Sequence, residues 1–232
     1  MSISTSKRWL AAAATVFAGL VPLAGYAASQ QAPNYLPALA PDTARITGTV
    51  NNTQLVALKG SKPSLALAKY DTGALPAGRT IRNVTLLLKR SPAKQAQFEN
   101  YLAQLTAPGS PYFQHWLTAR QIGTLFGPAP ADITKVGQWL QSQGLRIGEV
   151  SPTGLMIGFS GTTAAIGHAF HTSLHGYTVN GAQHFANASE QQIPAALASV
   201  VVGATSLSNF FPKPQHMDVG TMGGREVLRR VG

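Results

Sequence analysis

The sequence contains no cysteine and few charged residues. Without thiols it has no disulfide framework, no thiol chemistry and no zinc site built on thiolates. Charged residues make up 11% of the 232 positions, whereas soluble domains average about 25%. Only 8 residues are acidic, and few carboxylates leave few groups whose protonation can unfold a protein in acid. The composition therefore suits an acidic environment.

Basic residues outnumber acidic ones, with 18 Lys and Arg giving a formal net charge of +10. Such a field can attract nucleic acid, an anionic membrane or an acidic protein surface. The basic residues are scattered, however, and no Lys/Arg-rich run is interleaved with aromatic residues. They include Arg45, Lys59, Lys62, Lys69, Arg79, Arg82, Lys89, Arg90 and Lys94, and then thin out until Arg225, Arg229 and Arg230. We therefore expect diffuse, solvated charge and no nucleic-acid partner.

The N-terminus is typical of an export signal. Lys7 and Arg8 form a positive region, residues 9–23 are mostly apolar, and small residues precede a predicted cleavage after Ala27. A retained membrane anchor is the alternative, but the apolar run is short for about 30 Å of hydrocarbon and Pro22 interrupts it. We predict a cleavable signal peptide, no permanent membrane anchor, and a secreted or periplasmic product.

The rest of the chain suits one domain with flexible ends. Residues 28–63 are predicted to be a flexible leader with weak strands, such as the one at 54–58, and a second weak strand is predicted just after the leader, at 65–69. The folded domain is expected at 64–211. Apolar periodicity is then lost, so that 212–232 is predicted to be a linker or tail.

Stronger elements follow within the domain. A buried strand is expected at 84–89, one hairpin is predicted from residues 146–159, and Asn180-Gly181 marks another at 174–186. Capping signals start helices after Ser91 and Thr118. Further helices are expected from Pro130, Thr162 and Pro194, the last running to Gly203, and five aromatic residues are expected in the core, namely Tyr112, Phe113, Trp116, Phe126 and Trp139. This order predicts an α+β fold, with helices packed on one face of a mostly antiparallel sheet.

The sequence contains no clear pattern of catalytic residues. The eight carboxylates include no pair within four residues on a helix, so no general acid and base pair is visible. The run Ser160-Gly161-Thr162-Thr163 is better explained as a strand-to-helix turn with threonine as the helix cap. His171 and His175 share the face of a predicted strand about 13 Å apart, too far for a common metal ion. We predict no catalytic residue and no metal site, with pH sensing by histidine as the alternative role.

Several motifs follow one another between Ser110 and Leu207. They are SPYFQHWLT, LFGPAPADITKVGQWLQSQGL, SPTGLMIGFSGT, AFHTSLHGYTV, HFAN and IPAALASVVVGATSL. In this order they resemble the N-terminal activation domain of the sedolisin or kumamolisin family of serine-carboxyl peptidases. The family usually has Tyr-His-x-Trp-Leu-Thr, whereas His115 is shifted by one place here. Ala129 stands where a serine often caps a helix, a loss of about 1 kcal/mol.

The resemblance implies a ferredoxin-like or subtilisin-propeptide-like fold. It also implies a pro-region that assists folding of a peptidase catalytic domain and inhibits it until acid pH. Ser208, Asn209, Phe210 and Phe211 would begin a linker that runs through the substrate cleft. The family's Ser-Glu-Asp set and calcium site lie in the peptidase domain, which we expect this chain to lack, and Thr163 stands where the serine of the nucleophile motif would be. Catalysis and calcium are therefore not expected here.

Two other functions are compatible with the sequence. One is a freestanding secreted inhibitor or binding module that acts in trans on a separate protease. The other is a basic, envelope-associated protein that binds anionic polymers, for which strong salt dependence without protease inhibition would be diagnostic.

Overall fold

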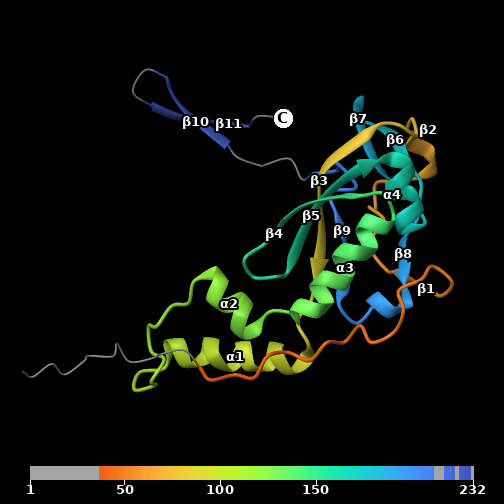
Figure 1. The fold of residues 1–232 in the computed structure, drawn as a ribbon. Coiled ribbons are helices and arrows are strands. Elements are labelled where there is room, and N and C mark those ends of the chain that lie inside the picture. Colours follow the sequence, from red (N-terminus) through yellow and green to blue (C-terminus); the bar gives the residue numbers. More distant parts are fainter. Residues whose placement is uncertain (1–36, 212–216, 223–224, 231–232) are drawn as a thin grey trace, which may run out of the picture. The chain divides into compact units, whose positions relative to one another are not determined.

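The computed structural model describes residues 37–211, 217–222 and 225–230, the last two ranges as backbone. The predicted signal peptide, its cleavage after Ala27 and the start of the leader lie outside these residues. The elements are, in chain order, β1 (Leu55–Leu58), the 3-10 helix η1 (Ala68–Tyr70), β2 (Asp71–Ala74), β3 (Thr80–Leu88), α1 (Pro92–Thr106), α2 (Ala119–Phe126), α3 (Pro130–Ser142), β4 (Arg146–Val150), β5 (Met156–Thr162), α4 (Thr163–Phe170), β6 (Leu174–Val179), β7 (Ala182–Asn187), β8 (Gln191–Pro194), the 3-10 helix η2 (Ala195–Leu197), β9 (Val201–Thr205), β10 (Met217–Met222) and β11 (Arg225–Arg230) (Figure 1).

The largest sheet has the strand order β4-β5-β3-β9, and every neighbouring pair is antiparallel. Helices α1 to α3 connect β3 to β4, and α4 connects β5 towards β9. This is the order of a ferredoxin-like β-α-β-β-α-β unit, enlarged by extra helices in the first connection. Smaller sheets pair β2-β6-β7 and β1-β8. The predicted α+β class with a mostly antiparallel sheet is confirmed.

One face of the largest sheet carries the main core. Along β3, Val84, Leu86 and Leu88 are buried at alternate positions, as expected for a strand with one covered face. Helices α3 and α4 supply the apolar residues that pack against this face (Figure 1). A separate aromatic cluster joins α1 to α2, where Tyr101 and Phe126 lie 5.6 Å apart between ring centroids.

The predicted helix starts are confirmed by their hydrogen bonds. The Ser91 side chain accepts from the backbone N–H of Lys94, and Thr118 and Gln121 form the expected capping box. At the start of α3, Ala129 makes no side-chain cap. The nearby Asp132 carboxylate instead accepts from the backbone N–H groups of the leader, as described next.

The later part of the leader is anchored, contrary to the predicted flexibility. The Asp132 carboxylate is fully buried and accepts from Arg45 N at 2.9 Å and Ile46 N at 2.9 Å. Lys94, on α1, donates its ammonium group to Ala40 O at 2.6 Å. These partners lie far away in sequence, so composition and local periodicity could not indicate them.

Two predicted elements are wrong. Residues 65–69, expected as a weak strand, instead form a turn followed by the first two residues of η1. The helix predicted from Pro194 to Gly203 is divided among β8, η2 and β9. The buried Leu197 and Val200 fit helical spacing, but the chain makes only a 3-10 turn there, and the following valine run joins the edge of β3. Tertiary pairing has overridden the local pattern.

The predicted tail is not without regular structure. Strands β10 and β11 form an antiparallel hairpin, with Met217 opposite Arg230 and Met222 opposite Arg225. Among the helices that the structure describes, none combines the length and hydrophobicity needed to cross a bilayer.

Candidate docking surface

The Ser-Gly-Thr-Thr run has a structural role where β5 meets α4. The Thr162 side chain caps α4 by accepting from Ala165 N at 3.2 Å. Thr163 is buried and donates its hydroxyl to Pro76 O at 2.6 Å and to Ala77 O at 2.9 Å. Both hydroxyls are therefore engaged with the backbone, as expected for the end of a strand and the start of a helix.

Carboxylates of the small sheets organise loops. Asp71 accepts from Gly73 N at 2.7 Å and lies 2.8 Å from His175 Nδ1. The backbone N–H of Gly73, together with His175, lowers the pKa of Asp71 below its usual value. Glu190 accepts from the Ser61 hydroxyl at 2.7 Å and from the backbone of residues 60–62. These bonds, the hydroxyl first, lower the pKa of Glu190.

The histidines of residues 37–211 do not form a cluster of metal ligands. The imidazole of His175 is bonded to Asp71 and Ser173. His171 instead lies beside His168, with ring centroids 6.3 Å apart. Within the described part of the chain, no three residues among His, Asp and Glu are placed to share a metal ion.

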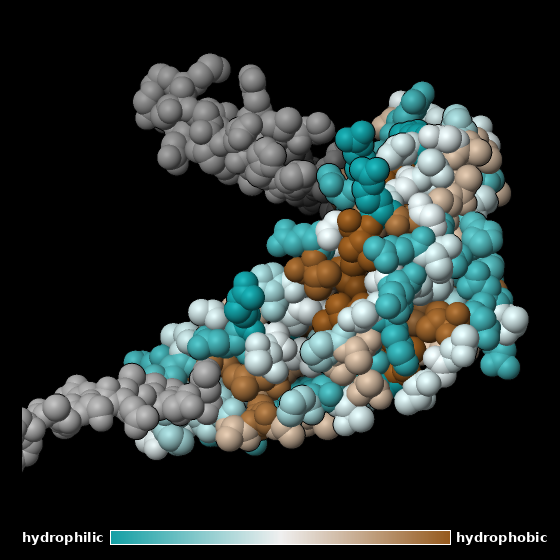
Figure 2. All heavy atoms as spheres, in the orientation of Figure 1, coloured by the Kyte–Doolittle hydropathy of each residue, from teal (hydrophilic) through white to brown (hydrophobic). Residues whose placement is uncertain are grey.

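The second face of the four-stranded sheet is open to solvent. Arg82 on β3 and Arg146 on β4 are exposed there, and Met156 on β5 is 44% exposed. Figure 2, in the orientation of Figure 1 with α3 and α4 towards the viewer, shows hydrophobic residues gathered where the sheet meets α3, with polar residues around them. Mixed apolar and charged residues on an exposed sheet face are typical of a surface that meets another protein.

Bulges shape this open face. The strand pairing shifts within β3–β5, β4–β5 and β3–β9. In the β3–β5 pair, the core-facing residues Ile81 and Val84 lie on either side of the shift. The residues at the three shifts are all exposed. Those residues are Arg82, Asn83, Gly148, Glu149 and Val202. Asn83 adopts a left-handed backbone with φ of 57°, a conformation that asparagine tolerates better than most residues.

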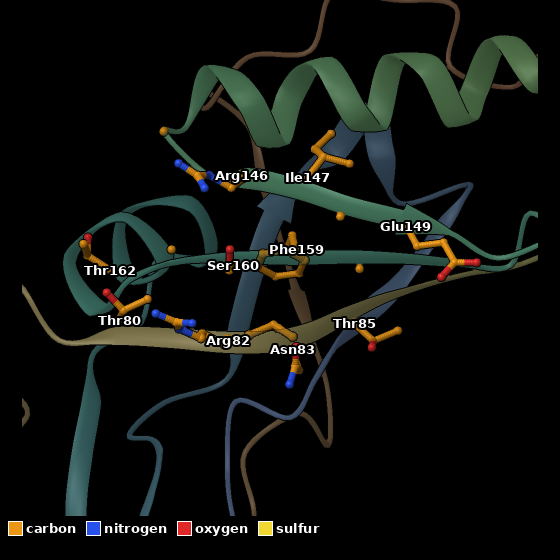
Figure 3. A pocket seen from close by; sticks show the side chains of 15 residues that line it. Thr80, Arg82, Asn83, Thr85, Arg146, Ile147, Glu149, Phe159, Ser160 and Thr162 are labelled. Atoms are coloured by element: carbon orange, nitrogen blue, oxygen red, sulfur yellow. The ribbon is translucent and has the colours of Figure 1, made fainter.

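Between the first two bulges lies the open-face hollow, with a volume of about 760 Å³. Its lining includes Arg82, Asn83, Arg146, Glu149 and Ser160. Figure 3 shows the two arginines at one end of the hollow, on either side of Ser160, and Glu149 at the opposite end. Gly158 leaves the floor without a side chain, and a Cβ atom there would lie 3.3 Å from a backbone oxygen.

Sequence reasoning missed the open-face hollow. From the sequence alone Arg82 is one of several scattered basic residues, and no local pattern distinguishes Arg146. A usable signal was present, because isolated glycines within strands, here Gly148 and Gly158, often mark bulges.

The predicted linker residues 208–211 leave the domain along β7. Asn209 is bonded on both sides of Phe185, accepting from Phe185 N at 2.7 Å and donating to Phe185 O at 3.1 Å. The ring of Phe210 stacks on His184 with centroids 4.5 Å apart. Phe211 is 71% exposed. The structure therefore holds Asn209 and Phe210 against the domain and leaves Phe211 exposed.

Trp116 differs from its expected core position. Its side chain is 73% exposed, whereas Phe126 and Trp139 are buried as predicted. The loop before Trp116 is held by a bond from Gln114 N to Leu105 O at 3.0 Å and by the Tyr101 hydroxyl, which donates to His115 O. The tryptophan is thus displayed on a fixed loop, and exposed tryptophan is a common interface residue.

Comparison with known proteins gives one family match, to Pro-kumamolisin, activation domain, over residues 69–210. This range is more than half of the chain and contains all of the four-stranded sheet. The chain belongs to the pro-kumamolisin activation domain family. This activation domain is 35% identical over 126 residues to xanthomonalisin from Xanthomonas sp. (strain T-22). It is 29% identical over 154 residues to sedolisin from Pseudomonas sp. (strain 101), and 30% identical over 161 residues to tripeptidyl-peptidase sed4 from Aspergillus fumigatus.

These matches involve only part of each relative. They cover 54% of this chain and 15% of xanthomonalisin, and 66% of this chain and 26% of sedolisin or of sed4. The activation domain therefore corresponds to a minor portion of each of these peptidases.

Proposed function

We propose that this chain is the pro-region of a secreted serine-carboxyl peptidase, which assists folding of the peptidase domain and inhibits it until acid pH. The observation that carries the proposal is the family match from Lys69 to Phe210, because it spans the sheet, its helices and the exit at β7. Catalysis belongs to the partner domain, as does any calcium. Export depends on the predicted signal peptide.

Docking is proposed through the open face of the four-stranded sheet. The face combines apolar side chains, including Met156 at 44% and Val202 at 49% exposure, with two exposed arginines. Such a mixture fits a protein interface, where an apolar centre supplies affinity and charges set orientation. The exposed Phe211 then leads the chain away from the domain, towards the substrate cleft of the docked peptidase.

Release of the pro-region in acid is proposed to follow from carboxylates that lose their charge at different pH values. Without Lys7 and Arg8 the chain keeps 16 basic and 8 acidic residues, so its partner is expected to offer carboxylates. Carboxylates of ordinary pKa protonate near pH 4, which removes their attraction to arginine. Asp71 and Glu190 have lowered pKa values and stay ionised to lower pH. The interface is thus weakened before these contacts within the domain are lost.

A freestanding inhibitor that acts in trans is the alternative. The two functions share the docking step and differ in whether one gene encodes both partners. The reading frame after codon 232 distinguishes them, because a continuing frame with a Gly-Thr-Ser motif and matching acidic residues indicates a proenzyme. A terminator with no such frame nearby indicates the freestanding module.

The proposal is tested with the peptidase domains of sedolisin and xanthomonalisin. Peptide cleavage is followed at increasing concentrations of the full chain and at several pH values. Recovery of activity from unfolded peptidase domain is measured with and without the chain. The proposal expects inhibition that weakens as pH falls, and faster or fuller recovery of activity in the presence of the chain. Unchanged cleavage at micromolar chain, together with unchanged recovery, would overturn it.

A further inference from the structure

We propose that the open-face hollow is a receptor for one carboxylate side chain of the peptidase surface, held between the guanidinium groups of Arg82 and Arg146. The proposal rests on the proposed function and specifies its contact. In this proposal the hollow recognises a charged group of the peptidase, whereas the rest of the docking face is largely apolar.

The charges of the hollow favour an anion. Arg82 and Arg146 come from different strands and lie on either side of Ser160 (Figure 3). Neither guanidinium makes an ion pair or hydrogen bond with another group among residues 37–211, and both side chains are exposed. Glu149 is the acidic residue of the lining, and it lies at the far end. Guanidinium groups match carboxylates in shape and bind them through paired hydrogen bonds.

The backbone is shaped to present these groups. In β3, both Arg82 and Asn83 stand opposite the single residue Ser160, so the bulge turns two polar side chains to the same face. The left-handed conformation of Asn83 maintains this arrangement at a small cost in conformational energy. Gly158 leaves the floor open, and the volume of about 760 Å³ admits a whole side chain. Bulges that redirect side chains are common next to functional sites.

A protein carboxylate fits better than a free anion. The hollow is shallow and open to water, so a small ion would have to compete with bulk solvent for two exposed arginines. The same sheet face carries the exposed apolar side chains of Met156 and Val202. A docked protein surface would cover these residues and exclude water from the hollow, which strengthens the charged hydrogen bonds. An Asp or Glu presented by an otherwise apolar surface is therefore the expected occupant.

The contact has a definite pH dependence. Arginine stays charged throughout, whereas an ordinary carboxylate loses its charge near pH 4. Affinity should therefore be constant from neutral pH down to about pH 5 and fall below it. Glu149 also faces the hollow and would repel a bound carboxylate. Its place at the far end leaves the two arginines as the dominant groups.

The test compares binding of the full chain to the peptidase domain of xanthomonalisin, by calorimetry, between about pH 3.5 and pH 7. Arg82→Gln and Arg146→Gln are each expected to weaken binding about tenfold at neutral pH. The double variant should lose most of the pH dependence, and Arg146→Lys should recover part of the affinity. Arg120→Gln, at an exposed position on α2, is the matched control and should bind like the wild type. Thermal unfolding checks that each variant is folded.

Two failures can be distinguished. If the wild-type chain binds but the hollow variants behave like Arg120→Gln, with the same pH profile, the carboxylate receptor is wrong and the proposed function stands. If the wild-type chain binds neither xanthomonalisin nor sedolisin at micromolar concentration, the proposed function fails and the receptor fails with it.

Discussion

Asp132 shows at the scale of one residue how a buried carboxylate fixes a distant segment. It is fully buried on α3 and accepts the backbone N–H groups of Arg45 and Ile46. Asp132→Ala would leave these donors without an acceptor in a buried site, at a cost of about 2–4 kcal/mol in the free energy of unfolding. Glu99→Ala is the control, because Glu99 is exposed and accepts one bond from Gln95. Equal chemical denaturation midpoints for the two variants would contradict the anchored leader.

The aromatic residues make a second residue-scale comparison. Phe126 is fully buried between α1 and α2, whereas Trp116 is 73% exposed. Phe126→Ala should therefore cost about 3–5 kcal/mol of unfolding free energy. Trp116→Ala should change it by about 0.5 kcal/mol or less, as for other exposed positions. Denaturant unfolding of both variants decides between this structure and a buried Trp116.

At the scale of elements, Glu190 connects the turn before β8 to residues 60–62. Its pKa is lowered from the ordinary 4.5, so its contribution to stability is complete above that value. The contribution is lost as pH falls through the lowered pKa of the folded state. Glu190→Gln should thus reduce Tm at neutral pH, and the difference from wild type should vanish in strong acid. Glu99→Gln is the control, and a Glu190→Gln deficit that is constant at all pH values would refute this role.

The segment at 208–211, which follows β9 and runs along β7, gives a second prediction at the scale of elements. The Phe185 N–H donates to the Asn209 side chain at 2.7 Å. Asn209→Ala removes this acceptor, so amide hydrogen exchange at Phe185 should become faster. Exchange at Leu86, in the centre of β3, should stay unchanged and serves as the internal reference. Unaltered exchange at Phe185 would show that the exit is not held by Asn209.

Local signals were sufficient for much of the fold. Ser91, Thr118 and the turn Asn180-Gly181 each determine their own element through neighbouring residues, and all three predictions are confirmed. The helix predicted from Pro194 to Gly203 is wrong because its valines belong to β9, which pairs with β3, a strand far away in sequence. The anchoring of the leader by Asp132 could not be predicted either, because Arg45 and Ile46 are also far from Asp132 in sequence.

The candidate site was less accessible to sequence reasoning. A bulge is a mismatch between two strands, so it depends on register that neither strand encodes alone. Arg82 and Arg146 are 64 positions apart and line the same hollow because both of their strands pair with β5. The linker at 208–211 is a prediction from the resemblance, whereas the bonds of Asn209 to β7 required the structure.

At the scale of the whole molecule, residues 37–211 form a folded domain, and no other part of that range covers the second face of its four-stranded sheet. In the proposed complex the peptidase domain would cover this face, and acid would remove the charges that hold the two together. The most direct measurement is the dissociation constant of the full chain with the peptidase domain of xanthomonalisin as a function of pH. We predict tight binding at neutral pH and a loss of at least about tenfold by pH 3.5, near where ordinary carboxylates protonate. Binding that is absent at neutral pH, or equally tight at both ends of this range, would contradict the account.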